Sequence, residues 1–283
     1  MLTVPSRVPV RLLGEADRPE VERLLDRAPI AGAQVAERVA VGGLSWWRSG
    51  ARIFGYGPQG RLESVCWFGA NLVPVLAERD AVAAFAELAL REGRRCSSIV
   101  GPASAVLELW SRLESTWDRP REIRPRQPLL MTDTAPPIAG DSRVRLVRPR
   151  EVDLIFPAAV AMYTEEVGVS PITESGGRAY RQRIVDLIRA RRAYALIEDG
   201  EVIFKAELAI VTRHTAQIQG VWVAPAWRGR GIGTACMAAV VRDALHRVAP
   251  CVSLYVNDYN LPARAVYRRC GFRQVGTFAT VLF

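Results

Sequence analysis

A glycine-rich segment between a short strand pattern and a long helical pattern most constrains how this chain folds. The strand pattern covers 217–223 and the helical pattern covers 231–248. Gly229, Gly231 and Gly233 fall at the junction, where glycine lets the backbone adopt positive φ or approach a ligand closely. A helix N-terminus offers unpaired N–H groups and a partial positive charge, which suits a phosphate. The segment therefore predicts either a phosphate-binding loop or a simple turn that leads into a helix.

Two arginines, Arg228 and Arg230, add full positive charges beside these glycines. The segment lacks the Gly-Lys-Ser/Thr ending of the phosphate loop found in nucleotidases. It also differs from the G-x-G-x-x-G dinucleotide loop, and no acidic residue follows where a ribose contact is expected. Nucleotide hydrolysis and hydride transfer are therefore disfavoured.

The rest of the second half indicates a mixed sheet with helices on both faces. Asp199-Gly200, a dipeptide favoured in tight hairpins, separates strand patterns at 193–197 and 202–211. Strands come before and after a strand–loop–helix–strand unit, which argues for this layered arrangement. The other expected elements are a helix through Tyr180, Ile184, Leu187 and Ile188, a strand at 252–256, a helix from Pro262 to about Cys270, and closing strands at 272–275 and 277–283.

The chain is long enough for two domains, since 283 residues is about twice the usual ~150. Apolar periodicity stops across 132–143, which we interpret as a linker between domains 1–131 and 144–283. Each half opens with a similar strand pattern, at 10–13 and 144–147, followed by a helical pattern. These similarities predict a duplicated α/β unit.

The C-terminal half resembles the GNAT family of N-acetyltransferases through two motifs. The pyrophosphate loop of that family, Arg/Gln-x-x-Gly-x-Gly/Ala, is matched by Arg228, Gly231 and Gly233. A later signature, Asn-x-x-Ala-x-x-x-Tyr-x-x-x-Gly-Phe, is matched by Asn260, Ala263, Tyr267, Gly271 and Phe272. The resemblance covers 144–283 and extends to a bacterial subfamily with an additional N-terminal domain of uncertain role. It implies an α/β (α+β) fold with a mixed, mostly antiparallel sheet flanked by helices, in two tandem domains.

The resemblance implies acetyl-CoA as co-substrate and no metal. In the family, the strand before the loop bulges and splays from its parallel neighbour, so that Val221 and Val223 would bind pantetheine and the thioester through their backbone. The loop N–H groups would hold the pyrophosphate. The cofactor-binding residues that we expect are Val221, Trp222, Val223, Arg228, Gly229, Arg230, Gly231, Ile232, Gly233, Thr234, Asn260 and Tyr267.

Tyr267 takes the position of the group that protonates the departing CoA thiolate. A phenol with an ordinary pKa of ~10 is protonated at neutral pH and can donate a proton. The alternative is that its ring only packs with Val266 and Phe272. Asn260 binds the loop backbone or the cofactor, or it simply begins a helix ahead of Pro262.

The base that would deprotonate the acceptor amine is not identified by the sequence. Gln217 and Gln219 stand where many relatives carry a glutamate, and an amide accepts no proton at neutral pH. Glu207 on the neighbouring strand is the candidate catalytic base, acting through a water, although it could instead pair with Lys205. The terminal carboxylate of Phe283 is a further alternative.

Two glutamates just after the first helix of the second half, Glu165 and Glu166, are candidate substrate-binding residues on the acceptor side. They could equally cap a loop. We expect a direct transfer of acetyl from acetyl-CoA to a primary amine of a small molecule or a protein, in a ternary complex. The alternative function is a non-catalytic acyl-CoA-binding regulatory or interaction protein.

The first half lacks the cofactor loop, because the strand pattern 73–76 leads into Ala77-Glu78-Arg79-Asp80. Carboxylates at a helix start satisfy its N-terminus and repel phosphate. We interpret this half as a degenerate GNAT-like domain that shapes the acceptor pocket or mediates association, which leaves a homodimer open. Trp46 and Trp47 are expected to be buried in its core, and the alternative is an exposed binding patch.

Composition narrows the remaining function classes. The net charge of +9 comes almost entirely from arginine, since Lys205 is the only lysine; because acidic residues are interspersed, a nucleic-acid-binding module is not expected. Two histidines without a ligand-type cluster disfavour a metal site. Five cysteines without a C-x-x-C pair indicate reduced thiols. No apolar run approaches the ~18 residues of a membrane span, so we expect a cytoplasmic protein without membrane contact.

Overall fold

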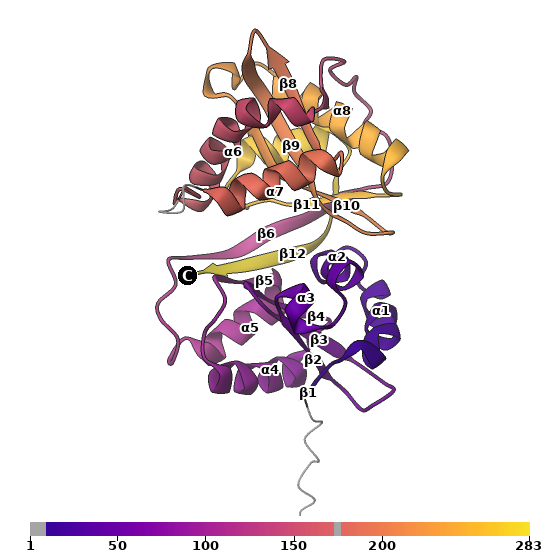
Figure 1. Cartoon of the computed structure of the whole chain (residues 1–283), viewed down its shortest axis with the longest axis vertical. Helices are drawn as coiled ribbons and strands as arrows, with labels where there is room; N and C mark the ends of the chain where they lie inside the picture. The colour runs from indigo at the N-terminus through magenta and orange to yellow at the C-terminus, as the bar shows by residue number, and fades with distance from the viewer. Residues whose placement is uncertain (1–9, 173–176) are drawn as a thin grey trace, which may run out of the picture. The chain divides into compact units, whose positions relative to one another are not determined.

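The computed structural model describes residues 10–172 and 177–283, which form two compact units. The first unit contains the chain up to Leu129 together with Tyr255–Tyr259 and Gln274–Phe283. The second contains Leu130–Leu254 and Asn260–Arg273. The chain therefore crosses between the units several times, whereas the sequence suggests a single change of domain in 132–143. Figure 1 shows the elements of each unit.

The first unit has a sheet whose strands follow the order β1-β2-β3-β4-β5-β12. Neighbours are antiparallel except β4 and β5, which are parallel. Its elements are β1 (Val10–Leu12), η1 (Glu15–Asp17), α1 (Arg18–Asp26), α2 (Ala33–Gly42), α3 (Trp46–Ser49), β2 (Arg52–Tyr56), β3 (Ser64–Phe68), β4 (Asn71–Val75), α4 (Arg79–Glu92), β5 (Ser98–Pro102), α5 (Ala103–Leu113), most of β6 (Glu122–Thr132) and nearly all of β12 (Arg273–Leu282).

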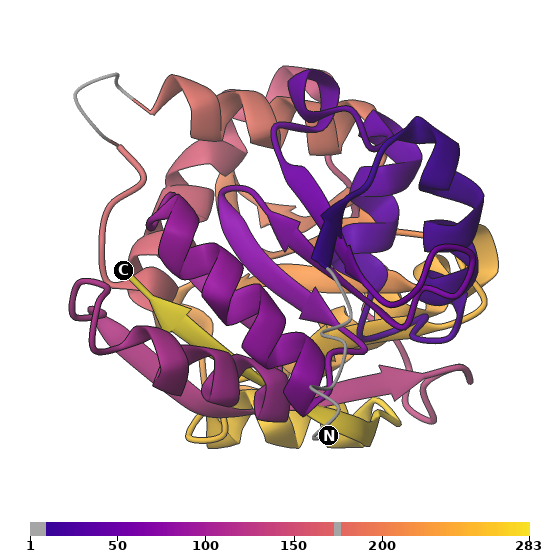
Figure 2. The same cartoon turned by 90° about the horizontal axis from the view of Figure 1, so that it is seen from below.

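Both faces of this sheet carry a hydrophobic core, because successive strand residues point to opposite faces. Ile53 packs with the helices α1 and α2, whereas its neighbour Phe54 packs with α4 and α5. The helices α4 and α5 lie side by side (Figures 1 and 2). The predicted α/β layering is thereby confirmed for this unit.

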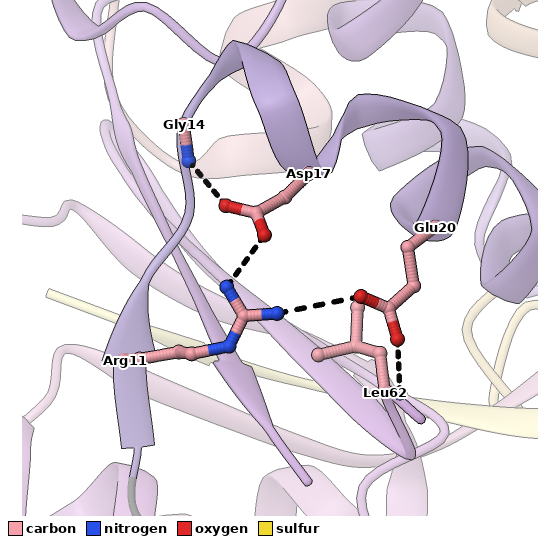
Figure 3. A network of polar contacts seen from close by, with 5 residues as sticks. All are labelled: Arg11, Gly14, Asp17, Glu20 and Leu62. Carbon is pink, nitrogen blue, oxygen red and sulfur yellow. Dashed lines mark hydrogen bonds and ion pairs between the residues drawn. The ribbon is translucent and has the colours of Figure 1, made fainter. Parts of the chain in front are cut away.

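A polar network ties β1 to the start of α1 (Figure 3). The Arg11 guanidinium donates to Asp17 Oδ1 at 2.6 Å and to Glu20 Oε2 at 3.3 Å. Asp17 Oδ2 accepts from the N–H of Gly14, and Glu20 Oε1 accepts from the N–H of Leu62. Charged hydrogen bonds therefore join the first strand, the first helix and the loop between β2 and β3.

Trp46 and Trp47 contradict the prediction that they belong to the core. Their exposed fractions are 64% and 70%, and their rings contact each other edge to face at 6.1 Å. The single-turn helix α3 presents both rings outward, while the core beneath is filled by Val35, Val39 and Leu44.

The second unit has a sheet of order β11-β10-β9-β8-β7, antiparallel except for the parallel pair β10 and β11. Asp199 and Gly200 have φ of +47° and +78°, as a tight hairpin turn requires. The elements are β7 (Arg145–Leu146), η2 (Pro149–Glu151), α6 (Val152–Val167), α7 (Arg178–Arg189), β8 (Ala193–Glu198), β9 (Glu201–Val211), β10 (Ala216–Val223), η3 (Pro225–Trp227), α8 (Ile232–Arg247), β11 (Val252–Tyr255) and α9 (Leu261–Arg269).

The segment 132–143 packs along α8. The N–H of Asp141 donates to the carbonyl of Ala235 at 3.0 Å, and the Arg242 guanidinium donates to the carbonyls of Pro136 and Ile138. A Cβ at Gly140 would lie 2.8 Å from Ala239 Cα, so glycine permits this close approach. Proline and glycine here mark a fixed strap on the second unit, although their composition resembles that of a linker.

The two units repeat one pattern of antiparallel strands, a short parallel pair and a helix. In the first unit, the last registered parallel pair is Leu72 with Ile99, and α4 begins seven residues after Leu72. In the second, it is Gln217 with Ser253, and α8 begins fifteen residues after Gln217. The shorter connection in the first unit leaves no room for a phosphate loop, and Glu78 is the N-cap of α4.

Candidate active site

A β-bulge interrupts β10 next to the glycine-rich loop. Gln219 pairs with Glu207 and Trp222 pairs with Lys205, so that Gly220 and Val221 together face the single residue between the two on β9. Gly220 has a φ of +59°. An extra residue on one strand of an antiparallel pair disrupts the ladder locally and re-aims the strand. The backbone of Gly220 and Val221 is therefore released from regular pairing.

The parallel strands β10 and β11 separate beyond their first two pairs. Ala216 is registered with Val252 and Gln217 with Ser253, and no later residue of β10 is registered with β11. The other edge of β10 stays paired with β9 as far as Val223. The bulge and this separation together open the sheet on the β11 side of Val221 and Val223.

The loop after β10 places three glycines at the start of α8. Gly229 and Gly231 have φ of +75° and +79°, and Gly231 is the N-cap residue. A Cβ at either would meet no atom within 4 Å, so the backbone here is open on that side. Gly233 packs closely on Val223, because a Cβ at Gly233 would lie 3.3 Å from Val223 Cγ2. The helix α8 therefore begins directly after a glycine turn that is open on this side, and the N–H of Thr234 in its first turn donates to the Gly231 carbonyl at 3.0 Å.

Arg228 and Arg230 of this loop have different partners. The Arg228 guanidinium donates to the Val223 carbonyl at 2.9 Å and to Glu165 Oε2 at 2.8 Å. The other oxygen of Glu165 accepts from Trp222 Nε1 at 3.1 Å. The Arg230 guanidinium lies over the ring of Trp227. Glu165, which the sequence suggests for the acceptor side, thus binds the loop arginine and the strand tryptophan.

Lys205 and Glu207 form a buried ion pair beside the bulge. Lys205 is 1% exposed and Glu207 is 4% exposed. Lys205 Nζ donates to Glu207 Oε1 at 2.6 Å and to the Gly220 carbonyl at 2.9 Å. The pairing that the sequence left open is therefore present, and it engages the Oε1 oxygen of Glu207.

Tyr267 lies on α9, and Asn260 directly precedes that helix. Asn260 is the N-cap residue, and its Oδ1 accepts from the N–H of Ala263 at 3.2 Å. Asn260 therefore begins the helix, as one of the two interpretations of the sequence suggests. Tyr267 is buried, with its ring 5.8 Å from that of Phe272. Burial, and then the negative charge of Glu166, raise the pKa of the Tyr267 phenol above its ordinary value. The phenol is therefore protonated at neutral pH, as a proton donor must be.

Two tyrosines that the sequence does not single out as site residues, Tyr163 and Tyr180, pack against each other. Tyr180 donates its hydroxyl to the Ala159 carbonyl at 3.0 Å and packs against Tyr163 at 5.2 Å between ring centroids. Burial, and then the charge of Glu207, raise the pKa of Tyr180, with a smaller contribution from Glu166. Tyr180 followed the helical pattern of α7, and only the fold brings it near a strand carboxylate.

The glutamines at the position of the usual glutamate and the terminal residue have clear positions. Gln219 Nε2 donates to Gln217 Oε1 on the same strand face at 3.1 Å. Phe283 lies among residues of the first unit, with its ring against Trp110 and Trp117 and its N–H on the Ser97 carbonyl. Among the described residues, no three His, Cys, Asp or Glu side chains gather as a metal site would require. No helix within 10–172 or 177–283 has the length and apolar character to cross a membrane.

Comparison with known proteins identifies the class of this site. The model of the acetyltransferase (GNAT) family matches residues 158–272. A domain of unknown function (DUF4081) matches residues 51–155. The second unit therefore carries a GNAT-family acetyltransferase domain, and the part of the chain before it includes a domain whose role has not been defined.

Solved structures share the fold across nearly the whole chain at low identity. A GNAT-family acetyltransferase from Colwellia psychrerythraea is 12% identical with a TM-score of 0.60, covering 97% of this chain and 99% of its own. A GCN5-related N-acetyltransferase from Sphaerobacter thermophilus is 17% identical with a TM-score of 0.63, covering 98% and 96%. A tandem GNAT protein from the clavulanic acid biosynthesis pathway is 14% identical with a TM-score of 0.52, covering 96% and 98%. The likeness supports the duplicated α/β fold.

Proposed function

We propose that this protein is an acetyl-CoA-dependent N-acetyltransferase that acetylates a primary amine by direct attack in a ternary complex. The observation that carries the proposal is the bulged β10, which separates from β11 and leads through Gly229 and Gly231 into the open N-terminus of α8. This arrangement lies inside a GNAT-family domain.

The residues of the loop fit a diphosphate. The turn at Gly229 and Gly231 is open on the side where a Cβ would stand, it leads directly into α8, and a helix N-terminus attracts anions. Arg228 already binds a carboxylate, that of Glu165, which is the kind of planar anion that guanidinium recognises. The backbone of Val221 and Val223 would bind pantetheine and the thioester in the gap between β10 and β11.

Three groups would carry the chemistry. Glu207 would take a proton from the acceptor ammonium through a water, because its Oε2 is not the oxygen bonded to Lys205. The N–H of Val221 would stabilise the oxyanion as nitrogen attacks the carbonyl. When the carbon–sulfur bond breaks, Tyr267 would give its proton to the thiolate.

Negative charge characterises the acceptor side. The negative charges of Glu207 and, less strongly, Glu166 both raise the pKa of Tyr180, whose ring packs against that of Tyr163. Such a surface would suit a protonated amine on its way to the thioester. The acceptor would be a small molecule or an exposed amine of a protein. The first unit, with no phosphate loop, would shape access to the acceptor or mediate association.

Calorimetry with acetyl-CoA tests the cofactor site directly. The wild-type protein should show saturable binding, and Gly231→Glu should abolish it, because the new carboxylate would stand at the anion site. Gly200→Glu is the matched control, since Gly200 has a similar positive φ in the hairpin turn and equally open space. A wild-type protein that released no heat and gained no stability from acetyl-CoA would refute the proposal.

A non-catalytic acyl-CoA-binding regulator is the second candidate. It is favoured by the ion pair of Glu207 with Lys205 and by the absence of a carboxylate at Gln217 and Gln219. CoA release from acetyl-CoA in the presence of spermidine, glucosamine or a peptide with a free N-terminus separates the two functions. Saturable binding without amine-dependent release of CoA from any acceptor class would favour the regulator.

A further inference from the structure

The only lysine of the chain lies buried at the bulge of β10. All other Lys/Arg positions are arginine, yet Lys205 is 1% exposed and its Nζ donates to Glu207 Oε1 and to the Gly220 carbonyl. A charge buried in this way is costly unless it is paired and hydrogen-bonded. Both conditions are met here, and one of the two acceptors is a backbone carbonyl of the acyl-transfer site.

The Gly220 carbonyl and the Val221 N–H belong to one peptide group. Among the described residues every peptide bond is trans, and a planar trans peptide points its C=O and N–H in opposite directions. By holding the carbonyl, Lys205 therefore fixes the direction of the N–H. At a bulge the regular ladder bonds that would otherwise hold this peptide are interrupted.

The surrounding residues make room for an ammonium group at this place. A Cβ at Gly220 would lie 3.1 Å from Lys205 Nζ and 3.2 Å from Glu207 Cδ, so a larger residue would displace the ion pair. An ammonium is a compact donor with three hydrogens, whereas guanidinium is planar and larger. The limited space therefore explains why this position carries a lysine, although every other Lys/Arg residue of the chain is an arginine.

We infer that Lys205 is a positioning residue for acyl transfer, which orients the Gly220–Val221 peptide so that the Val221 N–H meets the thioester oxygen. The inference rests on the proposed function. A donor aimed at a carbonyl that becomes an oxyanion stabilises the transition state more than the bound substrate. Loss of Lys205 should therefore lower kcat more than it weakens CoA binding.

The test compares Glu207→Gln with Lys205→Met/Glu207→Gln, so that the double variant has no stranded carboxylate. Because Glu207→Gln removes one charge of the buried pair, its fold is checked first by circular dichroism. Each variant is saturated with acetyl-CoA that carries ¹³C at the thioester carbonyl, and the carbonyl stretch is measured by isotope-edited infrared spectroscopy. We expect a higher stretching frequency, hence a weaker hydrogen bond, in the double variant. Relative to Glu207→Gln, which already lacks the proposed base, the Kd for CoA in the double variant should stay within about threefold. The kcat with an amine acceptor should fall by about another 10- to 100-fold, at most the effect of removing one oxyanion donor.

A second measurement uses the unaltered protein and needs no folded variant. Incorporation of ¹⁵N-lysine yields a single side-chain Nζ signal, since the chain has one lysine. A hydrogen bond at the Val221 N–H polarises the Gly220 carbonyl, so acetyl-CoA should shift the Nζ signal and CoA without the acetyl group should shift it less.

The outcomes separate this inference from the proposed function. Calorimetric binding of acetyl-CoA with an unmoved Nζ signal, or with equal carbonyl frequencies in the two variants, would overturn the role of Lys205 alone. A wild-type protein that does not bind acetyl-CoA would overturn both. A frequency difference at unchanged CoA affinity, together with an acetyl-dependent Nζ shift, would support the role.

Discussion

Removal of one charge from the Lys205–Glu207 pair should destabilise the second unit strongly. The two side chains are 2% and 5% exposed, so water does not replace the lost partner. Breaking a buried pair in this way typically costs about 3–5 kcal/mol, because it leaves an uncompensated charge. We expect Lys205→Met to have this cost. At about 2–4 °C for each kcal/mol in a chain of this size class, Tm should fall by roughly 6–20 °C.

Removal of both charges should be milder than removal of one. In Lys205→Met/Glu207→Leu no stranded charge is left, and replacing a buried pair by apolar residues is often neutral. The Gly220 carbonyl still loses its donor, which costs about 1–3 kcal/mol. The second substitution should therefore restore about 2 kcal/mol, within a range of about 0–4 kcal/mol, which is the difference between these two costs.

Urea unfolding of the full chain measures these changes, followed by circular dichroism and tryptophan fluorescence. Arg181→Met is the control, because Arg181 pairs with Asp153 on the surface with 43% and 87% exposure, and exposed pairs contribute about 0–1 kcal/mol. If Lys205→Met cost no more than Arg181→Met, or if the double variant were less stable than Lys205→Met, the reasoning would be refuted.

Further predictions concern the proton donor, the helix cap and the thiols. Tyr267→Phe should lower turnover by about 100-fold or more at unchanged CoA affinity, whereas wild-type turnover would remove this phenol from the mechanism. Asn260→Ala should cost about 1 kcal/mol in urea unfolding, because it removes the bond to the N–H of Ala263; no change would mean that the cap adds nothing. All five cysteines are buried, and burial raises the pKa of Cys236 to about 12 and of Cys270 to about 11. These two thiols stay protonated below those values, so a disulfide reagent at pH 8 should modify them only after unfolding; rapid modification of the native protein would contradict their burial.

Local signals in the sequence were sufficient for the hairpin and the loop. Asp199-Gly200 requires positive φ and forms the turn between β8 and β9. Gly229 and Gly231 also adopt positive φ, which glycine allows without steric strain. The helix α8 begins at Ile232, within one residue of its predicted start. Signals of this kind depend on backbone sterics within a few residues, so they can be identified without knowing the fold.

Predictions that depended on what packs nearby were less secure. The closing strands expected at 272–275 and 277–283 form one strand, β12, because Gly276 lies within it without ending it. That strand pairs with β5, so most of it belongs to the first unit. Pairing between distant segments follows from the sheet as a whole, which no local pattern records.

The sequence by itself determined the class of the second unit, since two motifs in the correct order require specific backbone geometry and side chains at specific spacings. Only the tertiary structure decided what the charged residues do. Lys205 and Glu207 are two residues apart on one strand, but the bulge on the neighbouring strand is what supplies the Gly220 carbonyl. Glu165 binds Arg228 across 63 positions of sequence. The strength and the partner of an ionic contact depend on burial and distance, and the fold sets both.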